Sequence, residues 1–178
     1  MATLSGGAKL QKILAQIGKD AEGGLTVGFL SGATYPDGTS VAQVAFWNEY
    51  GHGGNFPAPP RPFFRKMIAD ESGGWGVKLS KALKYFDYDA DKALRAMGED
   101  IKGALQQSIS TLESPELSPT TLMLRKTFWN NPGDIRRRDV LEAQRMVADG
   151  EEGATGTQAK PLIWTGHMLN SVDYEVKE

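Results

Sequence analysis

The two histidines of this chain and a nearby carboxylate are residues whose types could together bind a metal ion. His52 follows Glu49 at a helical spacing, and His167 lies beside a glycine near the C-terminus. A catalytic zinc site needs three protein ligands, which further hydrogen-bonding partners hold in place. Glu49, His52 and His167 are therefore a candidate metal set, although no spaced metal-binding motif supports it. The alternative is that His52 lies in an exposed turn and that His167 lies near the start of a helix.

Other catalytic chemistry finds little support in the sequence. The chain has no cysteine, which excludes thiol nucleophiles, thiolate zinc sites and disulfides. The Gly-His-Gly-Gly run at 51–54 lacks the spacing of a dinucleotide fingerprint and precedes prolines instead of a helix. No serine lies in a Gly-x-Ser-x-Gly elbow. We therefore predict that the protein is not an enzyme, that it has no catalytic residues, and that it binds no metal or cofactor.

The basic run at 136–138 is three consecutive arginines, and guanidinium groups suit phosphate binding. Four acidic residues surround it, namely Asp134, Asp139, Glu142 and Asp149. The whole chain carries 20 basic and 22 acidic residues, so its net charge of −2 does not indicate a nucleic-acid-binding protein. We favour a solvated or partner-facing helix here. The alternatives that remain are a DNA-binding accessory protein and, less favoured, a metal-dependent hydrolase.

The stretch from Val44 to Arg65 is rich in aromatic residues, prolines and arginines. Proline fixes the local backbone and removes a hydrogen-bond donor, and it pushes the preceding residue towards extended geometry. Residues 56–62 are therefore predicted to form a stiff, extended segment. Large side chains on a rigid segment suit docking to another protein better than catalysis.

The sequence of the first half of the chain predicts one strand, with helices before and after it. Residues 5–20 have an amphipathic helical pattern, and residues 25–30 alternate like a half-buried strand. A short helix is expected from about residue 40 until Gly51 ends it. A further helix begins at Phe63, is interrupted at 72–74 by Ser-Gly-Gly, and resumes to about Lys84.

The second half begins with the most regular helical pattern, which Asp89 caps and which ends before Pro115. Ser118 caps a short helix to about Lys126. Residues 128–159 contain a turn, a helix and a glycine-rich end, and are predicted to be a helical insertion or docking arm. The chain ends in an alternating strand. Strands near 24–30 and 170–177 are expected to form a small antiparallel or mixed sheet within a single α+β domain that spans residues 1–178.

The sequence does not predict association with a membrane. No run approaches the 18 apolar residues of a membrane helix. The N-terminus has no basic-then-apolar signal region. We expect the protein to act where it is made, or within an assembly formed there.

Two motifs together resemble one family. The first is Glu49-Tyr50-Gly51, followed by Pro57-Ala58 and then Arg61-Pro62-Phe63-Phe64-Arg65. The second is Leu-Ser-Pro-Thr-Thr at 117–121, followed by Pro-Leu-Ile-Trp-Thr-Gly at 161–166 and then Leu169, Ser171 and Val172. In this order they resemble the tail-completion and neck proteins of long-tailed bacteriophages. The 32 residues at 128–159 are longer than the usual connection in that family, and Trp164 replaces what is often a small or polar residue.

The resemblance implies a virion structural protein that completes the tail or joins it to the head. It implies a homo-oligomeric ring with neck and tail proteins as partners, and double-stranded DNA that passes through without specific binding. Its expected location is the head–tail junction or the top of the tail, reached from the host cytoplasm during assembly. The candidate interaction or structural residues are Trp47, Glu49, Tyr50, Arg61, Phe63, Phe64, Trp164, Thr165, Gly166 and Leu169.

The candidate aromatics fit a protein core as well as they fit an interface, so the sequence leaves both roles open. Arg61 precedes a predicted helix, where the positive end of the helix dipole disfavours a cation. We therefore expect Arg61 to bind a carboxylate or carbonyl oxygen, with Glu49 as its favoured partner.

Overall fold

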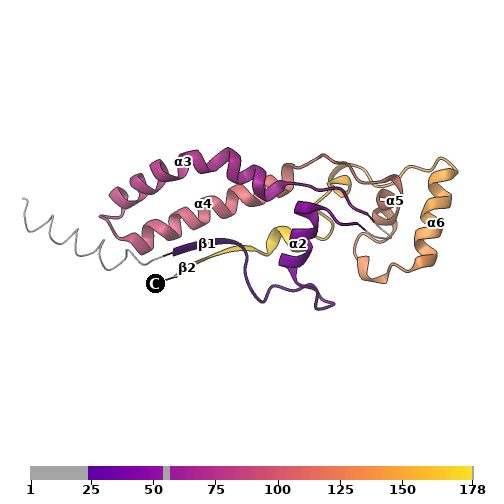
Figure 1. Cartoon of the computed structure of the whole chain (residues 1–178). Coiled ribbons are helices and arrows are strands. Elements are labelled where there is room, and N and C mark those ends of the chain that lie inside the picture. The colour runs from indigo at the N-terminus through magenta and orange to yellow at the C-terminus, as the bar shows by residue number, and fades with distance from the viewer. Residues whose placement is uncertain (1–23, 54–56, 178) are drawn as a thin grey trace, which may run out of the picture.

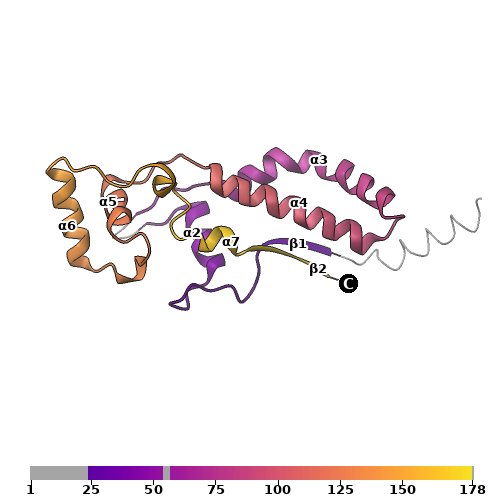
Figure 2. The same ribbon diagram turned by 180° about the vertical axis from the view of Figure 1, so that it is seen from behind.

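The computed structural model describes residues 24–53 and 57–177, and these form an elongated α+β fold (Figure 1). The elements in chain order are β1 (Gly24–Phe29), α2 (Val41–Tyr50), α3 (Phe63–Tyr85), α4 (Ala90–Thr111), α5 (Pro119–Thr127), η1 (Pro132–Asp134), α6 (Arg137–Ala148), η2 (Gly156–Ala159), α7 (His167–Asn170) and β2 (Val172–Lys177). Helices α3 and α4 and the two strands occupy one end, and α5 and α6 occupy the other (Figure 1). Helices α2 and α7 lie near the middle, which is clearest from behind (Figure 2).

The two strands pair with each other as an antiparallel ribbon, which confirms the predicted sheet. Leu25 pairs with Val176, and Phe29 pairs with Val172. Segments from opposite ends of the described chain are thus joined by backbone hydrogen bonds. A two-stranded ribbon is marginal in water by itself, and here it packs against α4.

Helix α4 is the centre of the core. The Asp89 carboxylate accepts a hydrogen bond from the backbone N–H of Lys92 at 3.1 Å, so the predicted N-cap is confirmed. Buried side chains recur along one face of α4 at helical spacing, at Met97, Ile101, Leu105 and Ile109. The helix packs against α3 and both strands.

Helix α3 differs from the prediction, because it continues without a break through Ser72-Gly73-Gly74 to Tyr85. Glycine weakens a helix by only about 1 kcal/mol relative to alanine. Trp75 and Leu79, which follow the glycines, pack against the hydrophobic core. Packing of this face onto α4 therefore outweighs the local propensity to break.

The α5–α6 end has buried side chains of its own. Met123, Ala143 and Ala154 are buried but lie outside the main core cluster. The Ser118 hydroxyl accepts a hydrogen bond from the backbone N–H of Thr121, which confirms the predicted cap of α5. Helix α6 lies within the predicted insertion at 128–159 and packs against α5. The single-domain assignment and the role of the insertion as a docking arm stay predictions.

Two sequence predictions fall wholly or partly on residues outside the described ranges. The amphipathic helix expected at 5–20 is one, and Phe56 at the start of the proline segment is the other. Across 24–53 and 57–177, none of the helices combines the length and apolar character needed to cross a membrane.

Candidate functional site

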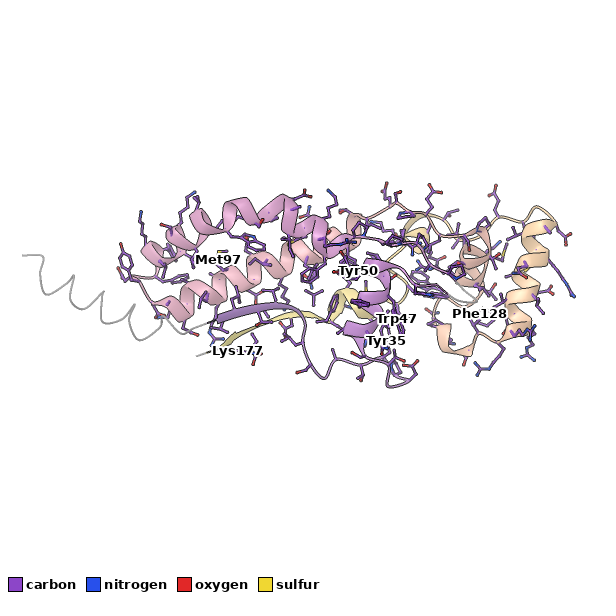
Figure 3. The ribbon with its side chains drawn as sticks, viewed as in Figure 1. Tyr35, Trp47, Tyr50, Met97, Phe128 and Lys177 are labelled. Atoms are coloured by element: carbon purple, nitrogen blue, oxygen red, sulfur yellow. The ribbon has the colours of Figure 1, made fainter. Side chains whose placement is uncertain are left out.

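Helix α2 buries a carboxylate and exposes aromatic rings, the reverse of an ordinary amphipathic helix. Val41, Ala45 and Glu49 are buried, and their i, i+4 spacing places them on one face. Three aromatic residues of α2, which we call the α2 aromatic surface, are largely exposed: Phe46 at 58%, Trp47 at 40% and Tyr50 at 53%. Trp47 and Tyr50 project from α2 in the middle of the molecule (Figure 3).

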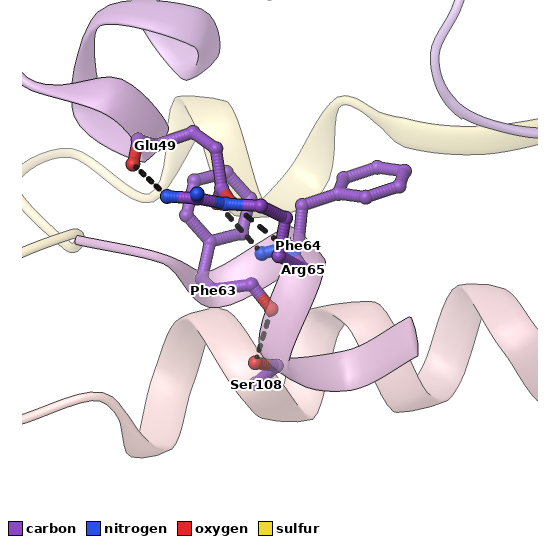
Figure 4. Close-up of polar contacts among 5 residues, drawn as sticks. All are labelled: Glu49, Phe63, Phe64, Arg65 and Ser108. Atoms are coloured by element: carbon purple, nitrogen blue, oxygen red, sulfur yellow. Dashed lines mark hydrogen bonds and ion pairs between the residues drawn. The ribbon is translucent and has the colours of Figure 1, made fainter. Parts of the chain in front are cut away.

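The buried Glu49 carboxylate caps the N-terminus of α3. Its Oε2 accepts a hydrogen bond from the backbone N–H of Phe64 at 2.9 Å, and its Oε1 accepts one from that of Arg65 at 3.2 Å (Figure 4). The N-terminal N–H groups of a helix have no partner within the helix and favour negative charge. The N-cap position of α3 is Pro62, whose side chain makes no capping hydrogen bond. Glu49 therefore supplies from α2 the cap that α3 lacks.

The predicted pairing of Glu49 with Arg61 is wrong, because Arg65 takes that place. Arg65 Nε donates to Glu49 Oε1 at 2.7 Å, and Arg65 Nη2 donates to the Glu49 carbonyl oxygen at 3.2 Å. Arg61 is buried and points to the chain after α4, where its Nε donates to the Pro115 carbonyl oxygen at 3.1 Å and its Nη2 to that of Glu116 at 3.3 Å. Burial lowers the pKa of Arg61. Of the two expected kinds of partner, Arg61 binds carbonyl oxygens.

Arg65 also connects the buried carboxylate to the α2 aromatic surface. Its guanidinium carbon lies 4.7 Å from the centre of the Tyr50 ring, a cation–π distance. The Tyr50 ring centre is in turn 4.7 Å from that of Phe46. Trp47 has its ring centre 6.3 Å from that of His52. Each residue of the α2 aromatic surface thus lies near another ring or a guanidinium group.

The described part of the proline segment is bound to the end of α2. His52 and Ala58 exchange backbone hydrogen bonds of 3.1 and 2.9 Å, and the Arg61 N–H donates to the Asn48 carbonyl oxygen at 2.7 Å. Gly51 has a φ of 74°, and a Cβ there would lie 2.7 Å from the Ala58 carbonyl oxygen. Residues 57–62 contain no helix, in agreement with the prediction from their prolines.

The two candidate phenylalanines have different environments. Phe63 is 1% exposed and is therefore a core residue, which resolves the choice between core and interface for this ring. Its carbonyl oxygen accepts a hydrogen bond from the Ser108 hydroxyl at 2.7 Å, which ties α3 to α4 (Figure 4). Phe64 is half-buried and packs against the edge of the core.

The second motif is organised around Arg125, a buried residue that is not among those predicted from the sequence. Arg125 Nη1 donates to the carbonyl oxygens of Gln158, Lys160 and Ile163, and Nη2 donates to that of Pro161, at 2.6–3.1 Å. Its guanidinium carbon is 5.1 Å from the centre of the Trp164 ring. Burial, with a smaller contribution from the charge of Arg61, lowers the pKa of Arg125 to about 10, so it stays charged at neutral pH.

Periodicity could not have identified Arg125. Met123 is buried as well, and residues two apart do not share a helix face.

The other residues of the second motif form the turn into α7. Gly166 has a φ of 75° at the N-cap of α7, the Thr165 hydroxyl accepts from the His167 N–H at 3.3 Å, and Leu169 packs against the core.

The residues of the metal-site alternative are not brought together. His52 is exposed and its Nδ1 lies 3.3 Å from the Gly53 carbonyl oxygen, whereas His167 Nε2 lies 2.9 Å from the Thr34 carbonyl oxygen. In the described part of the chain, no group of three or more histidine, aspartate or glutamate side chains is arranged to hold a metal ion. His167 begins α7, as the alternative interpretation predicted.

The arginine run lies at the N-terminus of α6. Arg136 Nη1 donates to the carbonyl oxygens of Gly133 and Ile135, and Arg138 Nε lies 3.5 Å from the Asp139 carboxylate. The Asp139 carboxylate also accepts a hydrogen bond from the Arg136 N–H at 2.7 Å. Two of the three guanidinium groups therefore have partners within the chain.

Comparison of this chain with protein-family models, with curated proteins and with solved structures finds no match.

Proposed function

We propose that this protein is a structural component of a tailed-bacteriophage virion that completes the tail or forms part of the head–tail neck. It acts by docking to other proteins and turns over no substrate. Its partners are further copies in a ring around the path of the DNA, together with neck and tail proteins on either side. It is located in the virion, after assembly in the host cytoplasm. The two sequence motifs that resemble the family support this proposal.

The α2 aromatic surface is the observation that carries the proposal. Aromatic and arginine side chains are enriched in protein interfaces and dominate their binding energy. Phe46, Trp47 and Tyr50 are exposed on adjacent turns, with the Arg65 guanidinium against Tyr50. A monomer gains little from exposing three large rings together, whereas a docking surface gains hydrophobic burial from each of them.

The contacts of Glu49 with the start of α3 support the same function, because they hold the α2 aromatic surface rigid. These hydrogen bonds fix the C-terminal turn of α2 against α3, which itself packs on the core. Preformed surfaces bind more tightly because less conformational freedom is lost on association. In a ring, each copy contacts the next through two different patches, with typically about 800 Å² buried per partner. The α2 aromatic surface is our candidate for one of these patches.

The experiment is to measure assembly of the purified protein, alone and with tail tubes, by native mass spectrometry and electron microscopy. Replacing Trp47 and Tyr50 by alanine should weaken assembly by about 30-fold or more, the effect of losing roughly 2 kcal/mol at an interface. Tyr85→Ala is the matched control, because Tyr85 is 82% exposed at the far end of α3. Equal losses in both variants, or normal assembly of the double variant, would contradict the proposal.

A separate measurement distinguishes the DNA-binding alternative. Our proposal predicts no tight binding of the wild-type protein to duplex DNA. Binding that weakens steeply with salt, and is lost when residues 136–138 are changed to glutamine, would favour the alternative instead.

A further inference from the structure

In the described part of the chain, an open apolar groove of about 380 Å³ lies between β1, α3 and α4. The described residues that line it are apolar side chains and one glycine, and none of them is charged. They include Leu25 of β1, Ile68, Trp75 and Leu79 of α3, and Met97 of α4. Met97 belongs to the buried core, whereas Leu25, Trp75 and Leu79 are only partly buried against it, so the groove is an open edge of the core.

The groove and the α2 aromatic surface are held apart on one rigid frame. The Glu49 carboxylate fixes the end of α2 to the first turn of α3, and Phe64 in that turn lines the groove, which continues along α3. Met97 lies at the groove, whereas Trp47 and Tyr50 lie on α2 near the middle of the molecule (Figure 3). The rings of the α2 aromatic surface, all within the described residues, do not line the groove. One copy therefore does not place its rings in its own groove, but a second copy can do so.

We propose that the α2 aromatic surface of a second copy docks in this groove. This inference rests on the function proposed above, in which each copy of a ring contacts the next through two different patches. The α2 aromatic surface is one of those patches and the groove is the other. Because each copy carries both, the same contact repeats from copy to copy until the ring closes.

The two surfaces agree in size. A large aromatic side chain can bury about 200 Å². Phe46, Trp47 and Tyr50 are 58%, 40% and 53% exposed, so together they leave about 300 Å² uncovered. This is more than a third of the roughly 800 Å² that each partner buries in a standard interface. The groove falls within the range of about 300–1,000 Å³ that is typical of pockets that enclose apolar groups.

The charges around the two surfaces also favour an apolar occupant. Arg65, which contacts the α2 aromatic surface, is paired with Glu49. On the groove side, Lys78 of α3 is paired with both Glu71 and Asp100. Docking of the rings would therefore bury no unpaired charge, which would oppose association. A charged segment of another protein would find no charge of opposite sign in the lining.

Cross-linking between copies tests the proposal, because the chain contains no cysteine of its own. Gln43→Cys in one copy lies one helical turn before Phe46 and Trp47. Ser72→Cys in the other copy lies one turn after Ile68 on the rim of the groove. Both replaced residues are exposed, and all the rings and groove side chains are retained. The two full-length proteins are mixed in equal amounts and treated with a short bismaleimide.

We expect dimers that join Gln43→Cys to Ser72→Cys. Their yield should be about ten times that obtained with Val77→Cys in place of Ser72→Cys, the ratio that a preference of about 1.4 kcal/mol gives. Val77 is the matched control, because it is 59% exposed on α3 and does not line the groove. Equal yields in the two mixtures, or no cross-link, would overturn the proposal. Dimers that form as readily from either single protein would show a symmetric contact and would also overturn it.

Mixing two blocked variants gives an independent readout by native mass spectrometry. Replacing Trp47 and Tyr50 by alanine removes the rings, and Ile68→Glu places a charge on the rim, where Ile68 is 38% exposed. Each variant alone should assemble about 30-fold more weakly than the wild type. An equal mixture should regain pairs of copies that grow no further, because one intact aromatic surface and one intact groove remain in each pair. Val77→Glu should assemble like the wild type, and a mixture that regains no pairs would overturn the proposal.

The outcomes separate this inference from the proposed function. If the variant without Trp47 and Tyr50 loses binding to tail tubes while Ile68→Glu assembles normally, the proposed function stands and the assignment of the groove fails. If the wild type neither assembles nor binds tail tubes, the proposed function fails, and the cross-linking yields decide whether two copies meet through the groove.

Discussion

Glu49 and Arg65 are joined twice, once through their side chains at 2.7 Å and once from the Arg65 guanidinium to the Glu49 carbonyl oxygen at 3.2 Å. The same carboxylate accepts hydrogen bonds from two backbone N–H groups at the start of α3. The Glu49 side chain is only 6% exposed, whereas the Arg65 side chain is 54% exposed. The two partners therefore contribute unequally to stability.

Glu49→Ala should lower the free energy of unfolding by about 3 kcal/mol, because two N–H groups at the start of α3 lose their buried, charged acceptor. Arg65→Ala should cost about 1 kcal/mol, because its side chain is largely solvated. Urea denaturation of both single variants and the double variant measures their coupling. The coupling of Glu49 with Arg65 should exceed that of Glu49 with Arg61, and the reverse order would contradict the observed pairing.

Arg125 binds four carbonyl oxygens between Gln158 and Ile163. Arg125→Met should destabilise the protein by about 3 kcal/mol, since several of these oxygens lose their donor. Arg125→Lys retains the charge but not the planar fork, so it should recover less than half of the loss. Hydrogen exchange should speed up first in residues 158–163. Full recovery by lysine would mean that charge alone matters.

Two glycines of α4 differ in the space available for a side chain. A Cβ at Gly98 would collide with the Tyr174 ring of β2, whereas a Cβ at Gly103 has no atom within 4 Å. Gly103→Ala should stabilise the protein by up to about 1 kcal/mol through helix propensity. Gly98→Ala should destabilise it by about 1–3 kcal/mol, because overpacking exceeds that gain. Thermal denaturation of both variants tests this difference, and stabilisation by Gly98→Ala would show that Tyr174 moves aside easily.

An ion pair between α4 and β2 should make the stability of the protein depend on pH. Lys102 Nζ donates to the Asp173 carboxylate at 3.0 Å, and this hydrogen bond holds the pKa of Asp173 below its ordinary value. A carboxyl group whose pKa is lower in the folded state stabilises the protein above its unfolded pKa, and that contribution disappears as pH falls through the folded pKa.

Asp173→Asn should therefore be less stable than the wild type at pH 7, and the difference should begin to shrink as the pH falls below about 4. Its size should stay under about 1 kcal/mol, because the Asp173 side chain is 57% exposed and solvent screens the pair. Urea denaturation at pH 7 and pH 3 measures it. A difference at pH 3 as large as that at pH 7 would assign the effect to packing.

The sequence by itself determined the features that depend on neighbours along the chain. Alternation predicted both strands, helical spacing predicted the buried face of α4, and the caps at Asp89 and Ser118 lie where expected. These features follow from periodicity and from hydrogen bonds that span three or four residues, so local pattern is sufficient to predict them.

The tertiary structure alone decided which groups far apart in sequence meet. Arg61 and Arg65 both follow Glu49 closely in the sequence, and either could have paired with it. In the folded chain Glu49 binds Arg65, whereas Arg61 binds carbonyl oxygens of the segment after α4. The burial of Arg125 and the continuity of α3 across its glycines likewise depend on packing against other elements. Such contacts leave no periodic signal, because each is fixed by how the elements pack and not by the spacing of residues.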